Sequence, residues 1–508
     1  MKERILLYVR IEYVSLYSGV ISNLQNIYDF VCVVPTIVTY NALRPIIDTN
    51  IKIYCIEKEL NNYSGNHTDD ELSKMEDELG ETLLLLNFSE LFIVKMSEGV
   101  YYHKDRNLQF YQRSSYCYYL LFKKIFETDM PNYIFFEVIN SAFSIICQNL
   151  AKKYNIPCVS LVTAYLDNSF YFSVGRSAAN PIFKEEYRKI DKSEYSIGEE
   201  LAQKILYNKM SSPGYMEIEK KYKSNRTFII KVVDALKFNA IKKIGCGIIK
   251  FYWSYLFNRK ALTYSSVPNV LQLLVQRRWK MPRGRKYLRS VITSPVSGEK
   301  FFIYFVHFQP EASTSAQSSL YVNQEYILET LAVTIPQSYK LYIKDHSTAS
   351  GMRGKQFFER FKYYPNIRLI NPSISSKELI AKASGVITIT GTSGFEAAIL
   401  NKPVVIFGNT YYDFLKNVHK VNNFYDLPGI FKNIEHTENM RNTRNDENSL
   451  RITAAYVKSL YKGYVNPYFN GHNLATKDNI NNVSKSIISF IKLLEKDQFK
   501  EMFIKYII

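Results

Sequence analysis

The chain has 508 residues and a net charge of +18, with 46% apolar and 15% aromatic residues. This length exceeds what one ordinary hydrophobic core accommodates, so we expect two or more domains. The apolar content excludes a disordered chain, and no run of about 18 uncharged apolar residues predicts a membrane-spanning helix. The six cysteines form no CxxC or Cys/His cluster, which argues against a zinc site and favours a reducing compartment.

Residues 1–165 alternate short β-branched or aromatic runs with helical patterns. The strand-like runs are RILLYV, FVCVVPT, IKIYCI and NYIFFEV. This alternation predicts a parallel sheet covered by helices, here an N-terminal Rossmann-like domain. The first residues lack a secretory signal pattern and are typical of a first strand, so we expect a cytoplasmic protein.

Residues 166–298 are predicted to form a helical, basic linker or insertion. Between residues 221 and 290 the chain holds 17 lysines and arginines and one acid, Asp234. Apolar, basic and aromatic residues mix in 226–260, which favours binding to an anionic membrane surface on the inner face of a cytoplasmic membrane. A solvated helical face is the alternative. Nucleic acid is not expected, because no RNA-binding motif accompanies the aromatic and basic residues.

Residues 299–475 return to a clearer alternation, which predicts a second Rossmann-like domain. Its strand-like runs are FFIYFVHF, YKLYIKDH, NIRLI, GVITIT and PVVIFG, separated by amphipathic helical patterns. Residues 476–508 are predicted to form one amphipathic C-terminal helix. The fold class is therefore α/β, with two domains facing a cleft.

Two predicted loops of the second domain carry chemistry at the carboxyl ends of strands, where open α/β sheets bind ligands. Gln309, Pro310 and Glu311 interrupt the first apolar strand, and the proline stiffens the turn before the carboxylate. A turn or a helix cap is the alternative for Glu311. Lys344 and His346 follow the next strand, where histidine can donate to a phosphate and lysine can neutralise one.

A third loop, from Gly391 to Gly394, turns a strand into a helix. Free backbone N–H groups at a helix start, together with the hydroxyls of Thr392 and Ser393, form an anion site. Glu396 is expected in the first helical turn, where it could accept from ribose hydroxyls or simply compensate the helix dipole. The segment lacks both GxxxxGK[ST] and GxGxxG, so it predicts neither a Walker A loop nor a dinucleotide site.

The three loops are expected at one edge of one sheet, which suits transfer of a sugar from a nucleotide. The leaving phosphate must be stabilised as charge develops on it. A carboxylate must either deprotonate the acceptor or attack the anomeric carbon. No DxD motif follows a predicted strand, so we expect no metal and no cofactor beyond the donor itself.

Residues 301–412 resemble the capsule-polysaccharide synthesis family of bacterial β-Kdo transferases, and bacterial sialyltransferases share related motifs. The family's QxE, HP and GT-x-G-x-EA motifs correspond to Gln309–Glu311, His346 and 391–397. Ser347 stands where the family motif has proline. The resemblance implies a GT-B arrangement of two Rossmann-like domains, with a CMP-activated 2-keto acid sugar bound by the C-terminal one.

Carried over residue by residue, the resemblance makes Glu311 the catalytic carboxylate of a retaining enzyme, or the base of an inverting one. It also implies that His346 binds the CMP phosphate. Thr392 and Ser393 would bind the phosphate region, and Glu396 would bind the ribose. We expect Gln309, Lys344, Gly391 and Gly394 to complete the nucleotide site.

The resemblance also implies that the N-terminal domain binds the acceptor, a surface or capsular glycan or glycolipid. Its best candidates are Glu137 and Arg176, neither of which we assign to catalysis. Three alternatives stay open: a CMP-activated nonulosonic acid as donor, a cytidine-nucleotide polyol-phosphate transferase, and a non-catalytic scaffold of a glycan assembly complex.

Overall fold

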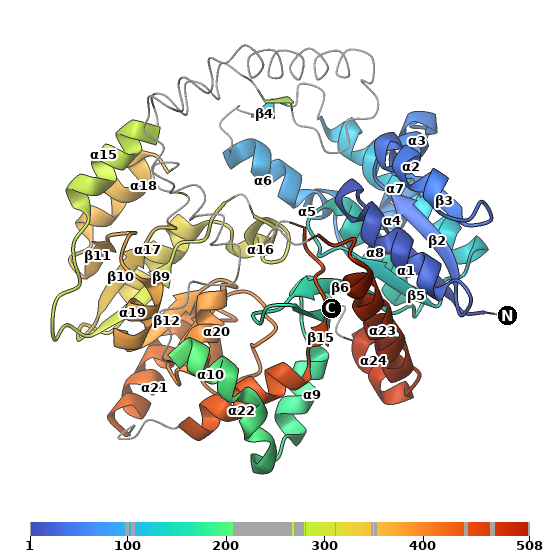
Figure 1. The fold of residues 1–508 in the computed structure, drawn as a ribbon. Coiled ribbons are helices and arrows are strands. Elements are labelled where there is room, and N and C mark those ends of the chain that lie inside the picture. Colours follow the sequence, from blue (N-terminus) through green and yellow to red (C-terminus); the bar gives the residue numbers. More distant parts are fainter. Residues whose placement is uncertain are drawn as a thin grey trace, which may run out of the picture.

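The fold contains two parallel-sheet domains (Figure 1). The computed structural model describes residues 2–96, 101–102, 107–206, 267–268, 279, 281–309, 311–346, 349, 353–440, 446–467 and 473–505. The predictions for 226–260 and for Pro310 lie outside the described residues, and so does Ser347. The α/β fold class with two domains is confirmed.

The N-terminal sheet has seven strands in the order β15-β7-β6-β5-β1-β2-β3. Strands β1, β2, β3, β5 and β6 pair in parallel, whereas β7 and β15 join the edge antiparallel. The strands are β1 (Arg4–Tyr8), β2 (Asp29–Val34), β3 (Lys52–Cys55), β5 (Tyr133–Phe136), β6 (Cys158–Thr163), β7 (Ser169–Ser173) and β15 (Tyr461–Lys462).

Both faces of this sheet are buried, which explains why its strands are continuous apolar runs. Ile5 and Leu7 face one core while Leu6 and Tyr8 face the other. The first core is covered by α1 (Val14–Leu24), α2 (Ile37–Leu43), α23 (Lys477–Leu494) and α24 (Asp497–Lys505). The second is covered by α3 (Ile56–Asn62), α4 (Asp69–Leu79), α5 (Leu83–Leu86), α7 (Leu108–Thr128) and α8 (Ala142–Lys153). Helix α6 (Phe88–Met96) follows α5, and β4 (Tyr101–Tyr102) pairs with β8 (Val267–Pro268).

The C-terminal sheet has six parallel strands in the order β11-β10-β9-β12-β13-β14. They are β9 (Phe301–Phe305), β10 (Lys340–Lys344), β11 (Ile367–Ile370), β12 (Gly385–Thr388), β13 (Val404–Ile406) and β14 (Val418–Lys420). One face packs on α9 (Pro181–Lys189), α10 (Glu199–Leu206), α19 (Ser376–Lys382), α20 (Thr392–Ile399) and α22 (Asp446–Lys458). The other packs on α15 (Met281–Val291), α17 (Gln324–Thr334), α18 (Lys355–Glu359) and α21 (Leu427–Met440).

The segments that join the domains differ from the predicted boundaries. The boundary expected at residue 165 falls inside a hairpin, because β7 folds back antiparallel on β6 through a turn in which Asn168 has a φ of 51°. Residues 181–206, expected in a separate linker, pack on the C-terminal domain as α9 and α10. Strand β15, expected in the C-terminal domain, pairs with β7 of the N-terminal sheet.

The predicted single terminal helix is two helices, α23 and α24, separated at Glu495 and Lys496. The break lets Phe503 pack on Phe490 with ring centroids 5.1 Å apart, and both side chains are fully buried. Burial of this second aromatic ring favours the reversal over a continuous helix. Both helices therefore belong to the N-terminal domain, where α23 lies next to α1 (Figure 1).

Five cysteines lie in the described part of the chain, and all five are buried free thiols: Cys32, Cys55, Cys117, Cys147 and Cys158. Across the described residues, no helix is long and apolar enough to cross a membrane.

Candidate active site

The three predicted loops lie at one edge of the C-terminal sheet. Strand β9 is flanked by β10 on one side and β12 on the other, and all three run in parallel. Their carboxyl ends therefore meet at the same edge, with Glu311 after β9, His346 after β10 and Gly391 after β12. The chain order leads from β9 outward to β10 and β11, then back to β12 on the opposite side. The edge between β9 and β12 is thus the topological switch point, where ligands of open α/β sheets bind.

Direct contacts join these loops. The Thr390 hydroxyl, beside the glycine turn, donates to the backbone oxygen of Ser313 in the Glu311 loop at 3.4 Å. On the other side, the ring of His346 lies 6.0 Å from that of Phe308. Each neighbouring loop therefore touches the segment that follows β9.

Arg353 ties the His346 loop to the end of β9. Its Nε donates to the Asp345 carboxylate at 2.9 Å, and its Nη2 donates to the backbone oxygen of His307. Both ionised side chains are almost fully buried, with 8% and 1% of their surface exposed. The His346 N–H donates to the same carboxylate at 2.9 Å. A buried, hydrogen-bonded charge pair of this kind fixes the geometry of the loop that carries His346.

The side chain of His307, which the sequence analysis missed, connects β9 to the glycine turn. Its Nε2 accepts from the backbone N–H of Ile389 at 3.1 Å and lies 2.9 Å from the hydroxyl of Thr388. Since Nε2 accepts from a backbone donor, it carries no proton, and the Thr388 hydroxyl must donate to it. That hydroxyl in turn accepts from the Gly391 N–H at 3.0 Å.

Burial, together with the nearby charges of Arg353 and His346, lowers the pKa of His307 to about 3. The imidazole is therefore neutral at physiological pH. Its only sequence signal is a polar residue inside the apolar run FVHF, which also suits a histidine satisfied in a core.

Two glutamines hold the chain after β9. The buried Gln324 accepts from the His307 N–H at 2.7 Å and donates to the His307 oxygen at 3.1 Å. Gln309, predicted to bind the nucleotide, donates to the backbone oxygen of Val322 at 2.8 Å. In this structure the Gln309 amide therefore fixes the loop, and a direct contact with a nucleotide stays a prediction.

Glu311 occupies the N-cap position of a short helix, α16 (Ala312–Ser315), but its carboxylate does not cap that helix. Instead it accepts from the Ser313 hydroxyl at 3.0 Å. The residue is exposed to solvent, yet protein surrounds the carboxylate closely enough to raise its pKa by desolvation, which the Ser313 bond offsets in part. Helix α16 contacts α6 of the N-terminal domain, and Ala316 packs into that domain's core. The carboxylate is thus accessible and lies near the contact between the domains.

Lys344 is buried at the end of β10, and its Nζ donates to the Ser376 hydroxyl at the start of α19 at 3.1 Å. This hydrogen bond directs its amine toward α19. The expected contact between Lys344 and a phosphate stays a prediction.

The glycine turn is built for close approach. A Cβ on Gly391 would lie 2.7 Å from the Thr388 hydroxyl, and one on Gly394 would lie 2.4 Å from the hydroxyl of Tyr412. Only glycine fits both places without displacing these groups. Gly391 is the N-cap of α20, so no N-cap side chain bonds to the N–H groups of the first turn. Thr392 is exposed and Ser393 half-buried, so this helix start is open on one side.

The placement of Glu396 in the first helical turn is wrong. Helix α20 begins at Thr392, so Glu396 is its fifth residue and lies beneath the turn. It is buried, and the hydroxyl of Tyr165 donates to its Oε1 at 3.0 Å. Burial raises the pKa of Glu396, while this bond and the nearby Lys377 lower it in part. The carboxylate therefore links α20 to the chain that follows β6, and its expected contact with ribose stays a prediction.

The N-terminal candidates lie in two separate ion pairs. Arg176 bonds to Glu81, which follows α4. Glu137 bonds to Arg10 at 3.1 Å. Within the described residues, no group of three or more His, Cys, Asp or Glu side chains could hold a metal ion.

Residues 311–416 match the family described as capsule polysaccharide biosynthesis protein. The C-terminal domain thus carries the signature of the capsule polysaccharide synthesis family. The match begins at Glu311 and extends past Tyr412, so it includes Glu311, His346 and the glycine turn. A comparison with curated proteins finds no match.

Solved structures match this chain at low similarity. A β-Kdo 2,4 transferase, KpsC of Thermosulfurimonas dismutans, is 11% identical with a TM-score of 0.30, covering 66% of this chain and 82% of that one. The β-Kdo 2,7 transferase of the same KpsC is 17% identical with a TM-score of 0.24, covering 44% and 62%. The UDP-GlcNAc 2-epimerase of Neisseria meningitidis is 12% identical with a TM-score of 0.25, covering 90% and 99%. At these scores the likeness carries no functional argument.

Proposed function

We propose that the protein is a glycosyltransferase of capsule polysaccharide synthesis that moves a 2-keto acid sugar, Kdo in the first instance, from a CMP donor to a glycan acceptor. The observation that carries the proposal is the junction of three loops at the C-terminal switch point. Thr390 contacts the Glu311 loop, and His346 contacts Phe308 from the other side. The family match over 311–416 supports the same reading.

In this proposal the start of α20 and His346 stabilise the phosphate that leaves with CMP. Backbone N–H groups at the start of α20 point out of the helix, and the helix dipole favours negative charge there. The network of His307 and Thr388 fixes the turn, so these donors need no reorganisation as charge develops.

Glu311 is the proposed nucleophile. One carboxylate oxygen attacks the anomeric carbon while the bond from that carbon to the CMP phosphate breaks, leaving the sugar on Glu311. The acceptor hydroxyl then attacks the same carbon, releasing Glu311, and its proton passes to water or to CMP. The raised pKa of Glu311 makes its ionised carboxylate more basic than that of an ordinary glutamate.

The donor class is tested by thermal unfolding in the presence of CMP, CDP, UDP or GDP. We expect selective stabilisation by CMP, because ligand binding to the folded state raises the unfolding temperature. Preference for UDP or GDP would overturn the donor class. Stabilisation by CDP instead would favour a polyol-phosphate transferase.

The role of Glu311 is tested by Glu311→Gln, assayed by sugar transfer from CMP-Kdo, with CMP-sialic acid as a second donor. We expect the rate to fall by about 100-fold or more, with CMP binding retained. Glu325→Gln is the matched control. Glu325 lies on α17, outside the three loops, and forms an ion pair with Arg360 at 3.2 Å. Equal rates for both variants would exclude Glu311. Mass spectrometry of wild-type protein with donor should show one added sugar on Glu311.

A further inference from the structure

The N-terminal sheet has a switch point of its own, and charged side chains gather there. From β1 the chain leads outward through β2 to β3, then returns to β5 on the opposite side of β1. Arg10 follows β1 by two residues, and Glu137 directly follows β5. Both therefore lie at the carboxyl ends of the two strands that flank the switch point, where open α/β sheets bind ligands.

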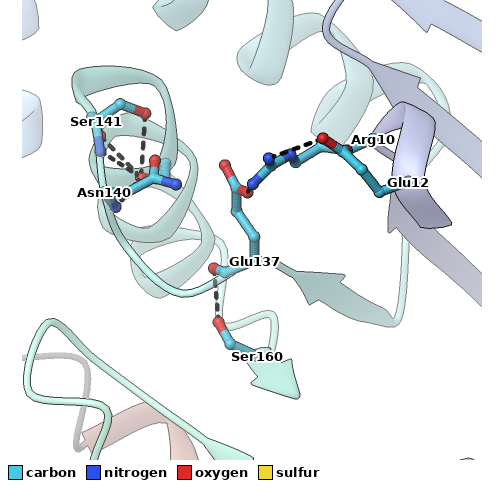
Figure 2. Close-up of polar contacts among 7 residues, drawn as sticks. Arg10, Glu12, Glu137, Asn140, Ser141 and Ser160 are labelled. Carbon is cyan, nitrogen blue, oxygen red and sulfur yellow. Dashed lines mark hydrogen bonds and ion pairs between the residues drawn. The ribbon is translucent and has the colours of Figure 1, made fainter. Parts of the chain in front are cut away.

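Arg10 connects two carboxylates at this edge. Its Nη1 lies 3.1 Å from Glu137 Oε2, and its Nη2 lies 3.4 Å from Glu12 Oε1. Figure 2 shows the Glu137 carboxylate between Arg10 and Asn140. The backbone oxygen of Glu137 accepts from the Ser160 hydroxyl at 2.7 Å, which fixes the residue against β6.

The cluster contributes little to the stability of the fold. The Glu137 side chain is only 14% exposed, and burial raises its pKa, although Arg10 and Asn140 lower it in part. Burial also lowers the pKa of Arg10, but Glu137 and Glu12 outweigh it and the net shift is upward. The Arg10 side chain is 33% exposed, and a half-buried ion pair of this kind adds little to the stability of the fold. Its presence at a switch point is better explained by ligand binding.

The chemistry of the cluster selects hydroxyl groups. Two carboxylates and one guanidinium give it a net negative charge, which disfavours a phosphate or an acid group. A sugar hydroxyl both donates and accepts, so it can donate to Glu137 and accept from Arg10. Asn140 Oδ1 is buried and has no hydrogen-bond partner among the described residues. A buried acceptor in this state is expected to take a donor from a ligand or water.

The donor site adjoins the same domain. Helix α16, which begins after Glu311, contacts α6, and Ala316 packs among the apolar residues under the N-terminal sheet. Tyr165, which follows β6, bonds to Glu396 beneath the glycine turn. The strand β6 that carries Ser160 therefore leads directly to a contact with the C-terminal domain.

We propose that Arg10, Glu137 and Asn140 form the subsite that binds hydroxyl groups of the acceptor glycan. This assignment rests on the proposed function, since it needs a donor site in the C-terminal domain. The three residues bind and orient the acceptor, and the bond-forming carboxylate remains Glu311.

The test uses the variant Glu137→Gln and measures its donor chemistry and its acceptor binding separately. Three quantities are measured: CMP affinity, hydrolysis of CMP-Kdo in the absence of acceptor, and transfer of labelled sugar to glycolipid extracted from cells lacking this gene. We expect CMP affinity and hydrolysis within about 2-fold of wild type. The glycolipid concentration needed for half-maximal transfer should rise by about 10- to 100-fold, the effect of losing a charged hydrogen bond. Glu137→Asp should recover part of the loss.

The matched control is Glu299→Gln. Glu299 also bonds to an arginine, Arg368, at 2.8 Å, and its side chain is also 14% exposed. It precedes β9 and so lies at the opposite edge of its sheet. We expect normal transfer from this variant.

The outcomes distinguish the two proposals. If wild-type protein neither binds CMP nor hydrolyses the donor, the proposed function fails and the acceptor subsite fails with it. If wild-type protein does both, and Glu137→Gln transfers with unchanged dependence on glycolipid, the acceptor subsite alone is overturned. Equal losses of hydrolysis and transfer in Glu137→Gln, with CMP affinity retained, would also overturn it, because they place Glu137 in donor chemistry. A variant that no longer unfolds cooperatively is replaced by Asn140→Ala, for which the same three outcomes apply.

Discussion

Nε2 of His307 lies 2.9 Å from the hydroxyl of Thr388, and this contact joins the ends of two neighbouring strands beneath the glycine turn. The Thr388 hydroxyl donates to the imidazole and accepts from the Gly391 N–H. One side chain therefore supplies a hydrogen bond to the buried His307 ring and another to the half-buried Gly391 N–H.

Replacing Thr388 by valine should therefore destabilise the protein and weaken CMP binding together. Valine keeps the shape but leaves His307 and the Gly391 N–H with one partner fewer each, at a cost of about 1–3 kcal/mol. Urea unfolding and CMP titration measure the two effects. Thr330→Val is the control, because its hydroxyl donates only to the Tyr326 oxygen one turn earlier in α17. Equal unfolding midpoints for the two variants would contradict this role.

The rate of sugar transfer should fall at low pH in a way that depends on Ser313. Glu311 must be ionised to attack, and its pKa is raised. As the pH falls, kcat/KM should therefore begin to decline at a higher pH than it would with an ordinary glutamate, whose pKa is about 4.3. The Ser313 hydrogen bond favours the ionised form. Ser313→Ala should therefore move the acid limb to still higher pH while leaving the rate at alkaline pH nearly unchanged. An unmoved limb would show that another group titrates.

Removing the Tyr165 hydroxyl should reduce stability more at pH 7 than at pH 4. Because the folded-state pKa of Glu396 is raised, the stability that this group contributes is fully present below its unfolded pKa and is lost as pH rises through the folded value. Tyr165→Phe removes a donor to the ionised form, so the loss at pH 7 should grow by about 1–3 kcal/mol. Denaturant unfolding at both pH values checks this, with Tyr425→Phe, 92% exposed, as control. Equal losses at the two pH values would contradict it.

A close backbone contact should make Gly198 intolerant of alanine. A Cβ there would lie 2.3 Å from the Ala454 backbone nitrogen and 2.4 Å from the Thr453 hydroxyl, so α22 must move. Overpacking of this kind costs about 1–3 kcal/mol. Gly429→Ala in α21 is the opposite case, since nothing lies within 4 Å of its added Cβ, and it should gain about 0.5–1 kcal/mol from helix propensity. Thermal unfolding of both variants should show shifts of opposite sign.

The parts of the fold that follow from local pattern were predictable. Glu311, His346 and Gly391 follow three apolar runs, and parallel pairing alone brings the ends of such strands together. His307 was missed because a buried histidine within an apolar strand does not reveal its partner, which comes from β12. Glu396 was misplaced because the helix start was not fixed by a capping side chain.

The short strand β15 could not be predicted for a different reason. It has two residues, and its partner β7 lies far away in the sequence. No local propensity specifies such a pairing; the tertiary contact decides it.

The return of β15, α23 and α24 to the N-terminal sheet also limits how this protein can be divided. Phe490 stacks on Phe172 with centroids 4.0 Å apart, so the last segment of the chain completes the core of the first. A chimera that exchanges the N-terminal domain with that of a relative must therefore transplant two stretches at once, the opening residues and the closing helices. A fragment cut before α23 would expose the apolar face on which Phe490 rests and would be prone to aggregate.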